Sequence, residues 1–475
     1  MPDLNTVLTI ILLIFVVVML FNIIIFVHEL GHFLAGKWRG LQIDRFQIWF
    51  GKPIWKKEIN GVQYGLGWIP AGGFVALPQM APMESIEGGN TTGKPLPKIS
   101  PLDKIIVAIA GPLFSILLAL LAAVVVWGVG KPKDFVPSTT VGYVAEGMPG
   151  EKAGILPGDL ILEINGEEVN GFAGSLQSIT ERIVLSSGDK IVFKVQRPGV
   201  DEPLTLTSGF DTPDSKWFQR SGLRQVGLAP AGPATIGKVY KNSPASKAGL
   251  EAGDVIVSVD GVDLFSDIQF AQYLEKKDYK TVNLGVKKAS GEIVEMELTP
   301  EAPLKPEGTT PKIGVLWDQT GDVDVRIVHP NPFSQVFDSL HMMWVTITSV
   351  ADPNSDIGVD HLSGPVGIGQ MLYQLLLTDD GWRRILGFMV LFNVNLAVLN
   401  MLPFPVLDGG HITLAILEKI AGKPVQAKAL EIIQTACALA LISLMLYVTS
   451  KDIGDKLGRG GGGGKEQEEI IFSAE

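Results

Sequence analysis

The sequence predicts a multi-domain integral membrane protein with a four-span α-helical core, a membrane-associated β-hairpin and two small α+β domains. The 475 residues are 46% hydrophobic and 19% charged, which is too apolar for an ordinary soluble protein and too charged for spans alone. Four apolar segments reach the roughly 20 residues that a membrane-spanning helix needs. A Gly-rich pattern between the second and third of these segments recurs about ninety-five residues later.

The four predicted spans are residues 7–33, 105–129, 385–402 and 427–448. The first has no charge before His28 and follows no basic leader, so we do not expect a cleaved signal peptide. The loop between the first two spans is rich in Lys and Arg, which places it in the cytoplasm by the positive-inside rule. Both termini and the long segment after the second span are then extracytoplasmic.

Charge and cysteine content restrict the partners and the metal chemistry. The net charge of −11 argues against a nucleic-acid partner. Cys437 is the single cysteine, so the sequence excludes an intrachain disulfide and a cysteine-based zinc site. Any metal ion must be bound by His, Asp or Glu.

The end of the first span carries His28-Glu29-Leu30-Gly31-His32. His-Glu-x-x-His on a helix places two imidazoles on one face, where both can reach one zinc ion, with the carboxylate beside them to handle protons. The alternative is that His28 and His32 are interfacial residues at a helix end. Ionisable groups at membrane depth are costly and usually functional, which favours the zinc site.

Two histidines do not complete a catalytic zinc site, which normally has three protein ligands and an open fourth position. Residues 400–411 read Asn-Met-Leu-Pro-Phe-Pro-Val-Leu-Asp-Gly-Gly-His and follow the third span. Pro403 and Pro405 favour extended backbone at membrane depth, which is tolerated only inside protein or beside a wet cavity. Asp408 and His411 are both candidates for the third ligand on spacing alone.

The internal repeat comprises residues 149–166 and 244–261, each with Lys-Ala-Gly, Gly-Asp and a final Asn-Gly or Asp-Gly. The unit reads as a short helix, a Gly turn, an apolar strand and a tight turn. It resembles the PDZ domain, which binds peptides as an added strand. We place the two domains at residues 136–222 and 223–302. The alternative is a pair of packing modules without a ligand.

Residues 64–77 contain Gly and aromatic residues in a weakly alternating pattern. We expect a membrane-dipping hairpin whose edge strand pairs with an unwound substrate, because an edge strand offers unpaired backbone groups. The candidate substrate-binding residues are Gly72, Gly73, Phe74, Val75, Pro403 and Pro405. An ordinary cytoplasmic loop is the alternative.

The remaining boundaries follow from composition. Residues 1–130 hold the first two spans and the hairpin loop, and residues 381–450 hold the last two spans. Residues 303–380 are expected to form a linker and interfacial helices. Residues 451–475 include a Gly run and acidic residues, and we expect a flexible tail.

Three features together resemble the site-2 protease family of intramembrane zinc metalloproteases, over about residues 1–455. They are the His28-Glu29-x-x-His32 motif, the paired PDZ-like domains and the Asn400-x-x-Pro403-x-Pro405-x-Leu407-Asp408-Gly409 motif. The layout of four spans and two PDZ domains is similar to the bacterial sigma-E-regulating type within that family.

The resemblance implies one Zn²⁺ ion bound by His28, His32 and Asp408, and so favours Asp408 over His411. Zinc then activates a water molecule, and Glu29 accepts the water proton and passes it to the leaving amine. The resemblance also implies that Asn400 assists the substrate or the developing oxyanion. The chain departs from the family at Ser115, a position often occupied by Asn.

The resemblance further implies an intramembrane endopeptidase of the bacterial inner membrane, with periplasmic termini and PDZ domains. Its substrates would be single-span membrane proteins, such as anti-sigma-factor-like proteins already trimmed by an upstream protease, and signal-peptide remnants.

Two other functions are alternatives to proteolysis. In a membrane transporter, Asp408 and the broken third span would form an ion site, but four spans without an inverted repeat argue against it. In a PDZ scaffold with an inactive zinc site, the complete motif around Glu29 would have no purpose. Zinc content and chelator-sensitive cleavage distinguish the three.

Overall fold

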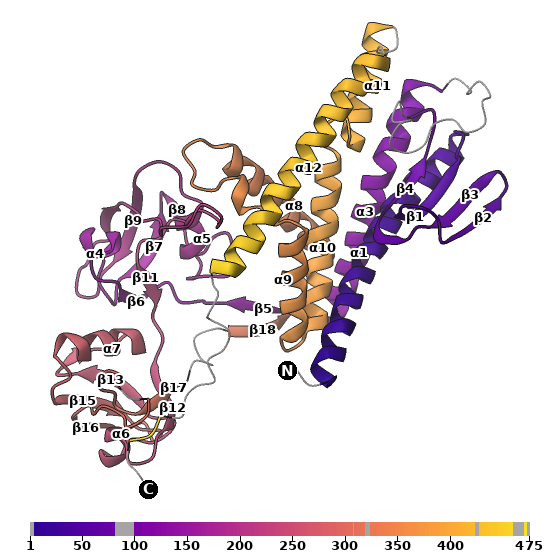
Figure 1. Cartoon of the computed structure of the whole chain (residues 1–475). Helices are drawn as coiled ribbons and strands as arrows, with labels where there is room; N and C mark the ends of the chain where they lie inside the picture. Colours follow the sequence, from indigo (N-terminus) through magenta and orange to yellow (C-terminus); the bar gives the residue numbers. More distant parts are fainter. Residues whose placement is uncertain are drawn as a thin grey trace. The chain divides into compact units, whose positions relative to one another are not determined.

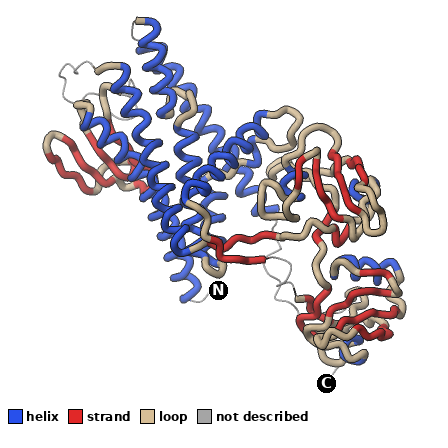
Figure 2. Tube along the Cα trace, turned by 180° about the vertical axis from the view of Figure 1, so that it is seen from behind, coloured by secondary structure: helices blue, strands red, loops and turns tan. Residues whose placement is uncertain are grey.

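The computed structural model describes residues 4–80, 99–306, 308–318, 324–422, 427–458 and 470–472 (Figure 1). The chain divides into two compact units. The first comprises Met1–Pro132, Ile327–Thr348 and Leu362–Ile453, and the second comprises Lys133–Arg326, Ser349–His361 and Gly454–Glu475. The first unit is mainly helical, whereas the second contains most of the strands (Figure 2).

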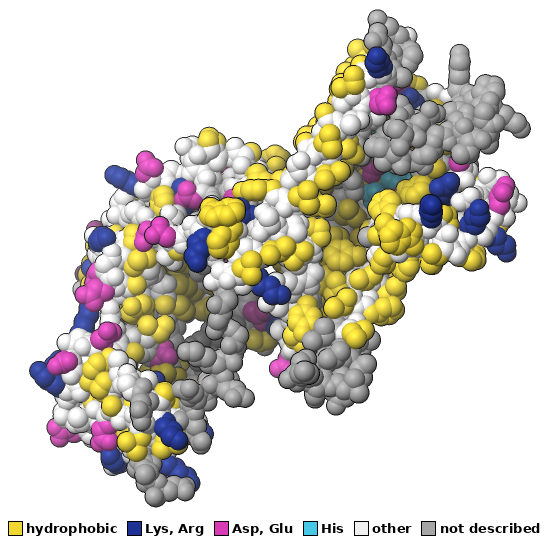
Figure 3. All heavy atoms as spheres, viewed as in Figure 1, with side chains coloured by type: hydrophobic (Ala, Val, Ile, Leu, Met, Phe, Trp, Pro, Cys, Tyr) yellow, Lys and Arg dark blue, Asp and Glu magenta, His cyan; other side chains and the backbone are white. Residues whose placement is uncertain are grey.

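Four helices within the described residues are long and apolar enough to cross a membrane, which confirms the predicted number of spans. They are α1 (Leu4–Trp38), α3 (Pro101–Val129), α10 (Gly381–Asn400) and α12 (Ala427–Gly458). On the face drawn in Figure 3, hydrophobic side chains gather over these helices, while Lys, Arg, Asp and Glu are frequent over the second unit. Helices with such surfaces are stable in lipid rather than in water.

The central helix of the first unit is α3, which packs against α1, α10 and α11 (Asp408–Ala421). Its first turn is fixed by a reciprocal cap, in which Ser100 accepts from the Asp103 N–H and Asp103 accepts from the Ser100 N–H. Small side chains let neighbouring helices approach closely. Where α3 packs on α10, the buried cluster consists of Ala119, Ala122 and Ala123 from α3 with Val390 and Val394 from α10.

A four-stranded sheet follows α1. Its strands are β1 (Arg45–Phe50), β2 (Trp55–Ile59), β3 (Val62–Leu66) and β4 (Ile69–Ala76), in the spatial order β2-β3-β1-β4. The expected hairpin over residues 64–77 is therefore wrong in its pairing. These residues do form strands, but β1 lies between β3 and β4, parallel to the former and antiparallel to the latter. β4 is an edge strand.

Shorter helices connect the two units and the last spans. They are α8 (Pro332–Ala351), the 3₁₀ helix η2 (Val359–His361) and α9 (Pro365–Leu377). Both α8 and α9 lie within residues 303–380, the region in which helices were expected. In α8, the Gln335 side chain donates a 3.0 Å hydrogen bond to the Ala123 carbonyl of α3. α8 thus packs on the spans and is not itself among the candidate membrane helices of the described chain.

The second unit contains two repeat domains, named here the first and second repeat domains. The first has β6 (Val141–Val144), α4 (Pro149–Lys152), β7 (Leu160–Ile164), β8 (Glu167–Glu168), α5 (Ile179–Val184), β9 (Ile191–Gln196), β10 (Leu204–Ser208) and β11 (Leu228–Pro230). The second has β12 (Ala234–Val239), α6 (Pro244–Lys247), β13 (Val255–Val259), β14 (Val262–Asp263), α7 (Asp267–Lys276), β15 (Val282–Lys287), β16 (Ile293–Leu298) and β17 (Val315–Trp317). Strands β5 (Lys131–Phe135) and β18 (Asp324–Val328) form a separate two-stranded sheet.

The repeated Gly-Asp residues have a structural role in both repeat domains. Asp159 is 1% exposed and pairs with Arg197 at 2.8 Å, while Asp254 is 2% exposed and pairs with Lys288 at 2.7 Å. Each aspartate also accepts a backbone N–H three residues before it. A buried carboxylate needs such partners. The aspartate of each Gly-Asp pair therefore stabilises the fold of its domain.

The structure corrects the predicted limits of the repeat domains. The first extends beyond residue 222, because β11 pairs with β6 and Val226 is buried in the first domain's core. The second extends beyond residue 302, because β17 pairs with β12 and Ile313 belongs to its core. In both domains a late strand returns to an early one, a long-range pairing that the local pattern does not reveal.

The predicted flexible tail is also partly wrong. Lys451–Gly458 continue α12, and Ile471 forms an isolated bridge with Lys305. The Gly run and most of the acidic segment after it lie outside the described residues.

Candidate metal centre

The two histidines of the predicted motif lie one helical turn apart in α1. His28 and His32 are 7% and 8% exposed, and their Nε2 atoms are 3.3 Å apart. An α-helix has 3.6 residues per turn, so side chains four positions apart share one face. The helix thus presents both imidazoles to the same space.

The second helix of the site, α3, contacts the other nitrogen of each imidazole. Nδ1 of His28 lies 3.0 Å from Oγ of Ser115, and Nδ1 of His32 lies 2.8 Å from the carbonyl oxygen of Val107. A carbonyl can only accept, so Nδ1 of His32 carries the proton and its Nε2 keeps a lone pair. Metal-binding histidines are oriented in this way.

Close approach of α1 and α3 depends on two glycines. A Cβ at Gly111 would meet the imidazole of His32, and a Cβ at Gly31 would meet the carbonyl oxygen of Ala110. The backbone of α3 therefore reaches the histidines only because these positions have no side chain.

The third member of the site comes from a distant part of the chain. α10 ends at Asn400, and a turn containing both prolines leads to Asp408, the first residue of α11. Oδ2 of Asp408 lies 3.3 Å from Nε2 of His28, and Oδ1 lies 3.3 Å from Nε2 of His32. Gly409 lets the turn close, because a Cβ there would meet the carbonyl oxygen of Met401.

These three side chains fit a zinc ion. Their ligand atoms lie within 4.8 Å of one another. In a tetrahedral site with metal–ligand distances of about 2.0–2.1 Å, two ligand atoms are about 3.3 Å apart, which is the separation observed here. Oδ2 of Asp408 is buried without a hydrogen-bond partner in the described chain, which a bound cation would explain. Two imidazoles and one carboxylate are a usual donor set for catalytic zinc.

The ligand atoms open onto a cavity of about 380 Å³. It is lined by His28, Glu29, His32, Phe50, Gly73, Phe74, Val75, Leu77, Met80, Asn400, Val406, Leu407, Asp408 and His411. Six of these fourteen residues are polar or charged and the others are apolar or glycine, so convergent polar groups and apolar side chains share one cavity, as in many ligand sites.

The structure brings most of the predicted site residues to this cavity. Glu29 and Asn400 line it together with the three candidate ligands, and so do the predicted residues Gly73, Phe74 and Val75. Gly72, Pro403 and Pro405 lie in the adjoining strand and turn but are not among the lining residues. His411 lines the cavity and is outside the group of possible metal ligands found in the described chain.

Sequence reasoning missed the contribution of α3 to the site. It noted Ser115 as a departure from a family pattern, but neither its contact with His28 nor that of Val107 with His32 was expected. Gly111 and Ser115 are small residues one turn apart in α3. Small residues at this spacing allow close helix packing, and this was the signal in the sequence that could have shown that α3 contacts the site.

Comparison with known proteins agrees with this geometry. The profile of Peptidase family M50 matches residues 15–444. The regulator of sigma-E protease RseP of Salmonella typhimurium is 28% identical over 451 residues, covering 89% of this chain and 94% of the relative. RseP of Escherichia coli is 27% identical over 453 residues, which cover 89% of this chain and 94% of the relative. A Neisseria meningitidis protein named as a zinc metalloprotease is 29% identical over 443 residues, which cover 90% of this chain and 95% of the relative.

Among solved structures, the PDZ domain of the SdrC-like protein from Listeria monocytogenes matches with 27% identity. It covers 19% of this chain and 90% of that domain, with a TM-score of 0.16.

Proposed function

Since this chain belongs to peptidase family M50 and is a zinc metalloprotease, we propose that it cleaves the membrane-spanning segments of single-span membrane proteins. The observation that carries the proposal is the convergence of His28 and His32 from α1 with Asp408 from α11. The first two belong to a helix apolar enough to cross a membrane. Hydrolytic groups in such a helix are best explained by a substrate within the bilayer.

The chemistry follows from the residues around the cavity. When bound, zinc acts as a Lewis acid that lowers the pKa of water towards about 7 and polarises the scissile carbonyl. His28, His32 and Asp408 would hold the ion. Glu29 accepts the proton of the attacking water and passes it to the leaving amine. Asn400, at the end of α10, donates a hydrogen bond to the carbonyl oxygen as negative charge develops there.

A helical substrate must expose its backbone before hydrolysis, and β4 offers a partner for the unwound segment. β4 is an edge strand, and its residues Gly73, Phe74 and Val75 line the cavity. Phe74 stacks on Phe50 with ring centroids 6.3 Å apart. Unpaired backbone groups of an edge strand can bind an extended peptide. Gly72 would bind the substrate from the same strand.

The turn between α10 and α11 would bound the other side of the substrate path. Pro403 and Pro405 lack backbone N–H groups, so they leave carbonyl oxygens as the polar backbone atoms offered to a peptide. Leu407 of the same turn lines the cavity. A substrate strand would then run between β4 and this turn.

The two repeat domains are proposed to be periplasmic PDZ domains of a protein in the bacterial inner membrane. The Lys- and Arg-rich loop after α1 favours a cytoplasmic position for that loop, and hence periplasmic termini and repeat domains. The substrates would be anti-sigma-factor-like proteins trimmed first by another protease, and signal-peptide remnants. RseP relatives are named as regulators of sigma-E proteases, which favours the former class.

Two roles of the repeat domains can be separated by deletion of residues 136–318. If the domains exclude untrimmed substrates, the deleted protein should cleave full-length substrate without a first cut. If they dock substrate, it should lose cleavage of both forms. Zinc content equal to that of the complete chain shows that the membrane unit of the deleted protein has folded.

The proposed activity is tested with the purified full chain in lipid vesicles and a fluorescent single-span peptide. We expect cleavage that a zinc chelator abolishes and added Zn²⁺ restores. Glu29→Gln should keep zinc and lose cleavage by at least about 10²-fold, which is the usual contribution of a general base. Cleavage by Glu29→Gln at the wild-type rate would overturn the assigned role of Glu29, and chelator-resistant cleavage would overturn zinc chemistry.

A further inference from the structure

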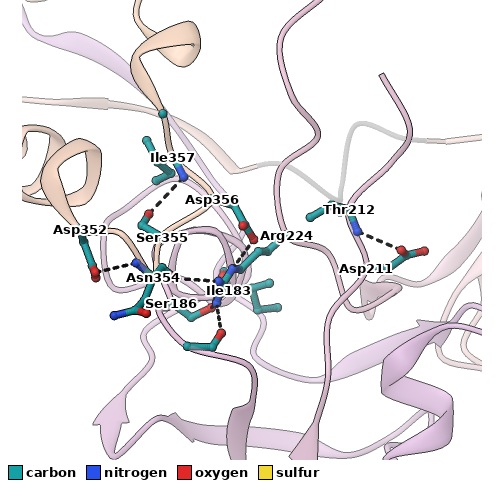
Figure 4. Close-up of polar contacts among 12 residues, drawn as sticks. Ile183, Ser186, Asp211, Thr212, Arg224, Asp352, Asn354, Ser355, Asp356 and Ile357 are labelled. Carbon is teal, nitrogen blue, oxygen red and sulfur yellow. Dashed lines mark hydrogen bonds and ion pairs between the residues drawn. The ribbon is translucent and has the colours of Figure 1, made fainter. Parts of the chain in front are cut away.

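A buried charged side chain can be required by folding alone, as Arg224 of the second unit shows (Figure 4). Its guanidinium donates to Asp356 at 2.6 Å, to the Gly188 carbonyl at 2.7 Å and to the Asn354 carbonyl at 2.9 Å. These partners satisfy the buried charge. His411 of the first unit is different, because it lines the cavity of the metal centre and the chemistry proposed above does not use it.

His411 lies near the start of α11, beside the third candidate ligand. It is three positions after Asp408, so the two side chains project from the same side of the helix. Both line the cavity, but His411 is not among the candidate metal ligands of the described chain. Its imidazole is therefore available for another contact.

That contact is a hydrogen bond between the imidazole of His411 and the backbone of Met80. The Met80 N–H already donates to the Leu77 carbonyl at 2.9 Å. The remaining polar group of the Met80 backbone is its carbonyl oxygen, which can only accept. His411 is therefore the donor, and the bond joins α11 to the turn that follows β4.

The turn at Met80 is coupled to β4, because both are tied to the loop after α1. The Asp44 N–H donates to the Ala76 carbonyl at 3.1 Å, at the end of β4. The Gln42 N–H donates to Oε1 of Gln79 at 3.0 Å, in the turn itself. A displacement of the turn would therefore displace the strand that is proposed to pair with substrate.

The helix at the other end of this hydrogen bond is fixed against α3. Asp408, His411, Ala415 and Glu418 are spaced by three or four positions, so they share one face of α11. Ala415 is fully buried, and Glu418 pairs with Nζ of Lys104 in α3 at 2.8 Å. Because α3 also contacts both histidines of the metal centre, the position of α11 relative to that centre is set by packing.

The placement of β4 relative to α11 matters because strand register determines which peptide bond is cut. A strand advances by about 3.3 Å per residue, so a shift of β4 by that length would bring the neighbouring bond of a paired substrate to the metal ligands. Smaller errors matter as well, since a misplacement of about 1 Å can slow a reaction by about 10²-fold. A contact that fixes β4 relative to Asp408 would control both the position and the rate of cleavage.

We propose that His411 is a positioning residue that determines which peptide bond of a substrate paired with β4 is hydrolysed. The inference rests on the proposed function and adds to it the residue that sets the cleavage position. The hydrogen bond with Met80 holds the substrate-pairing strand and the helix of the third ligand in one frame. Its removal allows the strand to shift while the metal ligands stay in place.

The first experiment measures the rate and the position of cleavage with the purified full chain in lipid vesicles and a single-span peptide. His411→Ala should retain zinc, lower kcat at least about 10-fold and change KM less than about three-fold, because it misplaces a substrate that still binds. It should also produce additional cuts next to the wild-type bond, identified by mass spectrometry. His411→Gln keeps a side-chain N–H that can donate to Met80, and it should restore the single cut.

Thr413→Ala is the matched control, because Thr413 lies two positions further along α11 and its hydroxyl donates to the Gly409 carbonyl of the same helix at 2.8 Å. This variant should cut the wild-type bond at the wild-type rate. A single wild-type cut by His411→Ala would contradict the proposal, and so would additional cuts that persist in His411→Gln. Loss of zinc from His411→Ala would assign the residue to the metal instead and would also overturn it.

The second experiment does not depend on catalysis. Hydrogen exchange of the peptide that spans residues 73–80 is measured by mass spectrometry in the full chain. His411→Ala should exchange at least about three-fold faster there, as expected for the loss of one hydrogen bond, whereas His411→Gln and Thr413→Ala should match wild type. Equal exchange in His411→Ala and wild type would refute the proposed role. If wild type cleaves no peptide, the proposed function fails, and the exchange result still decides whether His411 holds β4.

Discussion

Oγ of Ser115 in α3 lies 3.0 Å from Nδ1 of His28 in α1, across 87 positions of sequence. This contact leaves Nε2 of His28 facing Nε2 of His32 and the Asp408 carboxylate. Ser115 is completely buried, so no water competes for its hydroxyl. The orientation of a candidate zinc ligand is therefore determined by a helix that contributes no ligand itself.

Ser115→Ala should weaken zinc binding by about 10–100-fold, the usual effect of losing such an outer contact. The imidazole of His28 would lose the partner that fixes its ring. Zinc affinity is measured by competition with a chelating dye. Ser339→Ala is the matched control, because Ser339 is also buried but its hydroxyl bonds only to its own helix, at the Gln335 carbonyl. Equal zinc affinity in wild type and Ser115→Ala would contradict this prediction.

Gly111→Ala should prevent assembly of the metal centre, because the added methyl group would occupy the space of the His32 imidazole. We expect loss of most bound zinc, measured by elemental analysis of the purified chain. Gly128→Ala is the control in the same helix. A Cβ at Gly128 meets nothing within 4 Å, so this change should keep zinc and stabilise α3 by up to about 1 kcal/mol. Zinc bound normally by Gly111→Ala would show that the helix contact is not needed.

Proline in β4 tests the proposed strand pairing with substrate. Phe74→Pro and Val75→Pro remove two consecutive N–H groups, of which one points away from β1 because strand N–H groups alternate in direction. The variant that loses the outward N–H should retain zinc and lose cleavage of a helical substrate by at least about 10-fold. Phe74→Ala separates ring loss from backbone loss. If both proline variants cleave at the wild-type rate, β4 does not pair with substrate.

Acid should weaken the contact between the segment Lys216–Arg224, which follows β10 in the first repeat domain, and the carboxylate of Asp360. Burial alone would raise the pKa of Asp360, but the Ser221 N–H that donates to its carboxylate outweighs this, so its pKa lies below the usual value. A lowered carboxyl pKa stabilises the folded form above the unfolded pKa of about 3.9, and this is lost as the pH falls through the lower folded value. Asp360→Asn should therefore reduce hydrogen-exchange protection of the segment at pH 7, and the difference from wild type should shrink as acid protonates the Asp360 carboxylate. A difference that stays constant from pH 7 down to the pH of acid unfolding would contradict the assignment.

Local spacing was sufficient to single out the two histidines and to leave Asp408 and His411 as candidates for the third ligand, and the family resemblance favoured Asp408. Local spacing was not sufficient to predict the sheet. His28 and His32 are four positions apart in a helix, and the turn with Pro403 and Pro405 marks a break before Asp408. These signals are local. The order of the sheet is not, because β1 separates β3 from β4 and its parallel pairing with β3 has no sequence signature.

The repeat domains show the same limit. The Asn165-Gly166 and Asp260-Gly261 turns were predicted from the sequence, and all four residues have positive φ. The strands β11 and β17 were missed, because each is three residues long and pairs with a strand far away in sequence. Short strands become visible only with the long-range contacts that stabilise them.

The most direct test of the account is the metal content and affinity of the purified full chain and of Asp408→Asn. A site built from α1 and α11 together should hold one Zn²⁺ per chain in wild type. Loss of the charged third ligand should lower zinc affinity by at least about 10-fold, while His411→Ala should leave it unchanged. Full zinc affinity in Asp408→Asn, or loss of zinc in His411→Ala alone, would contradict the assignment of His28, His32 and Asp408 as the metal ligands.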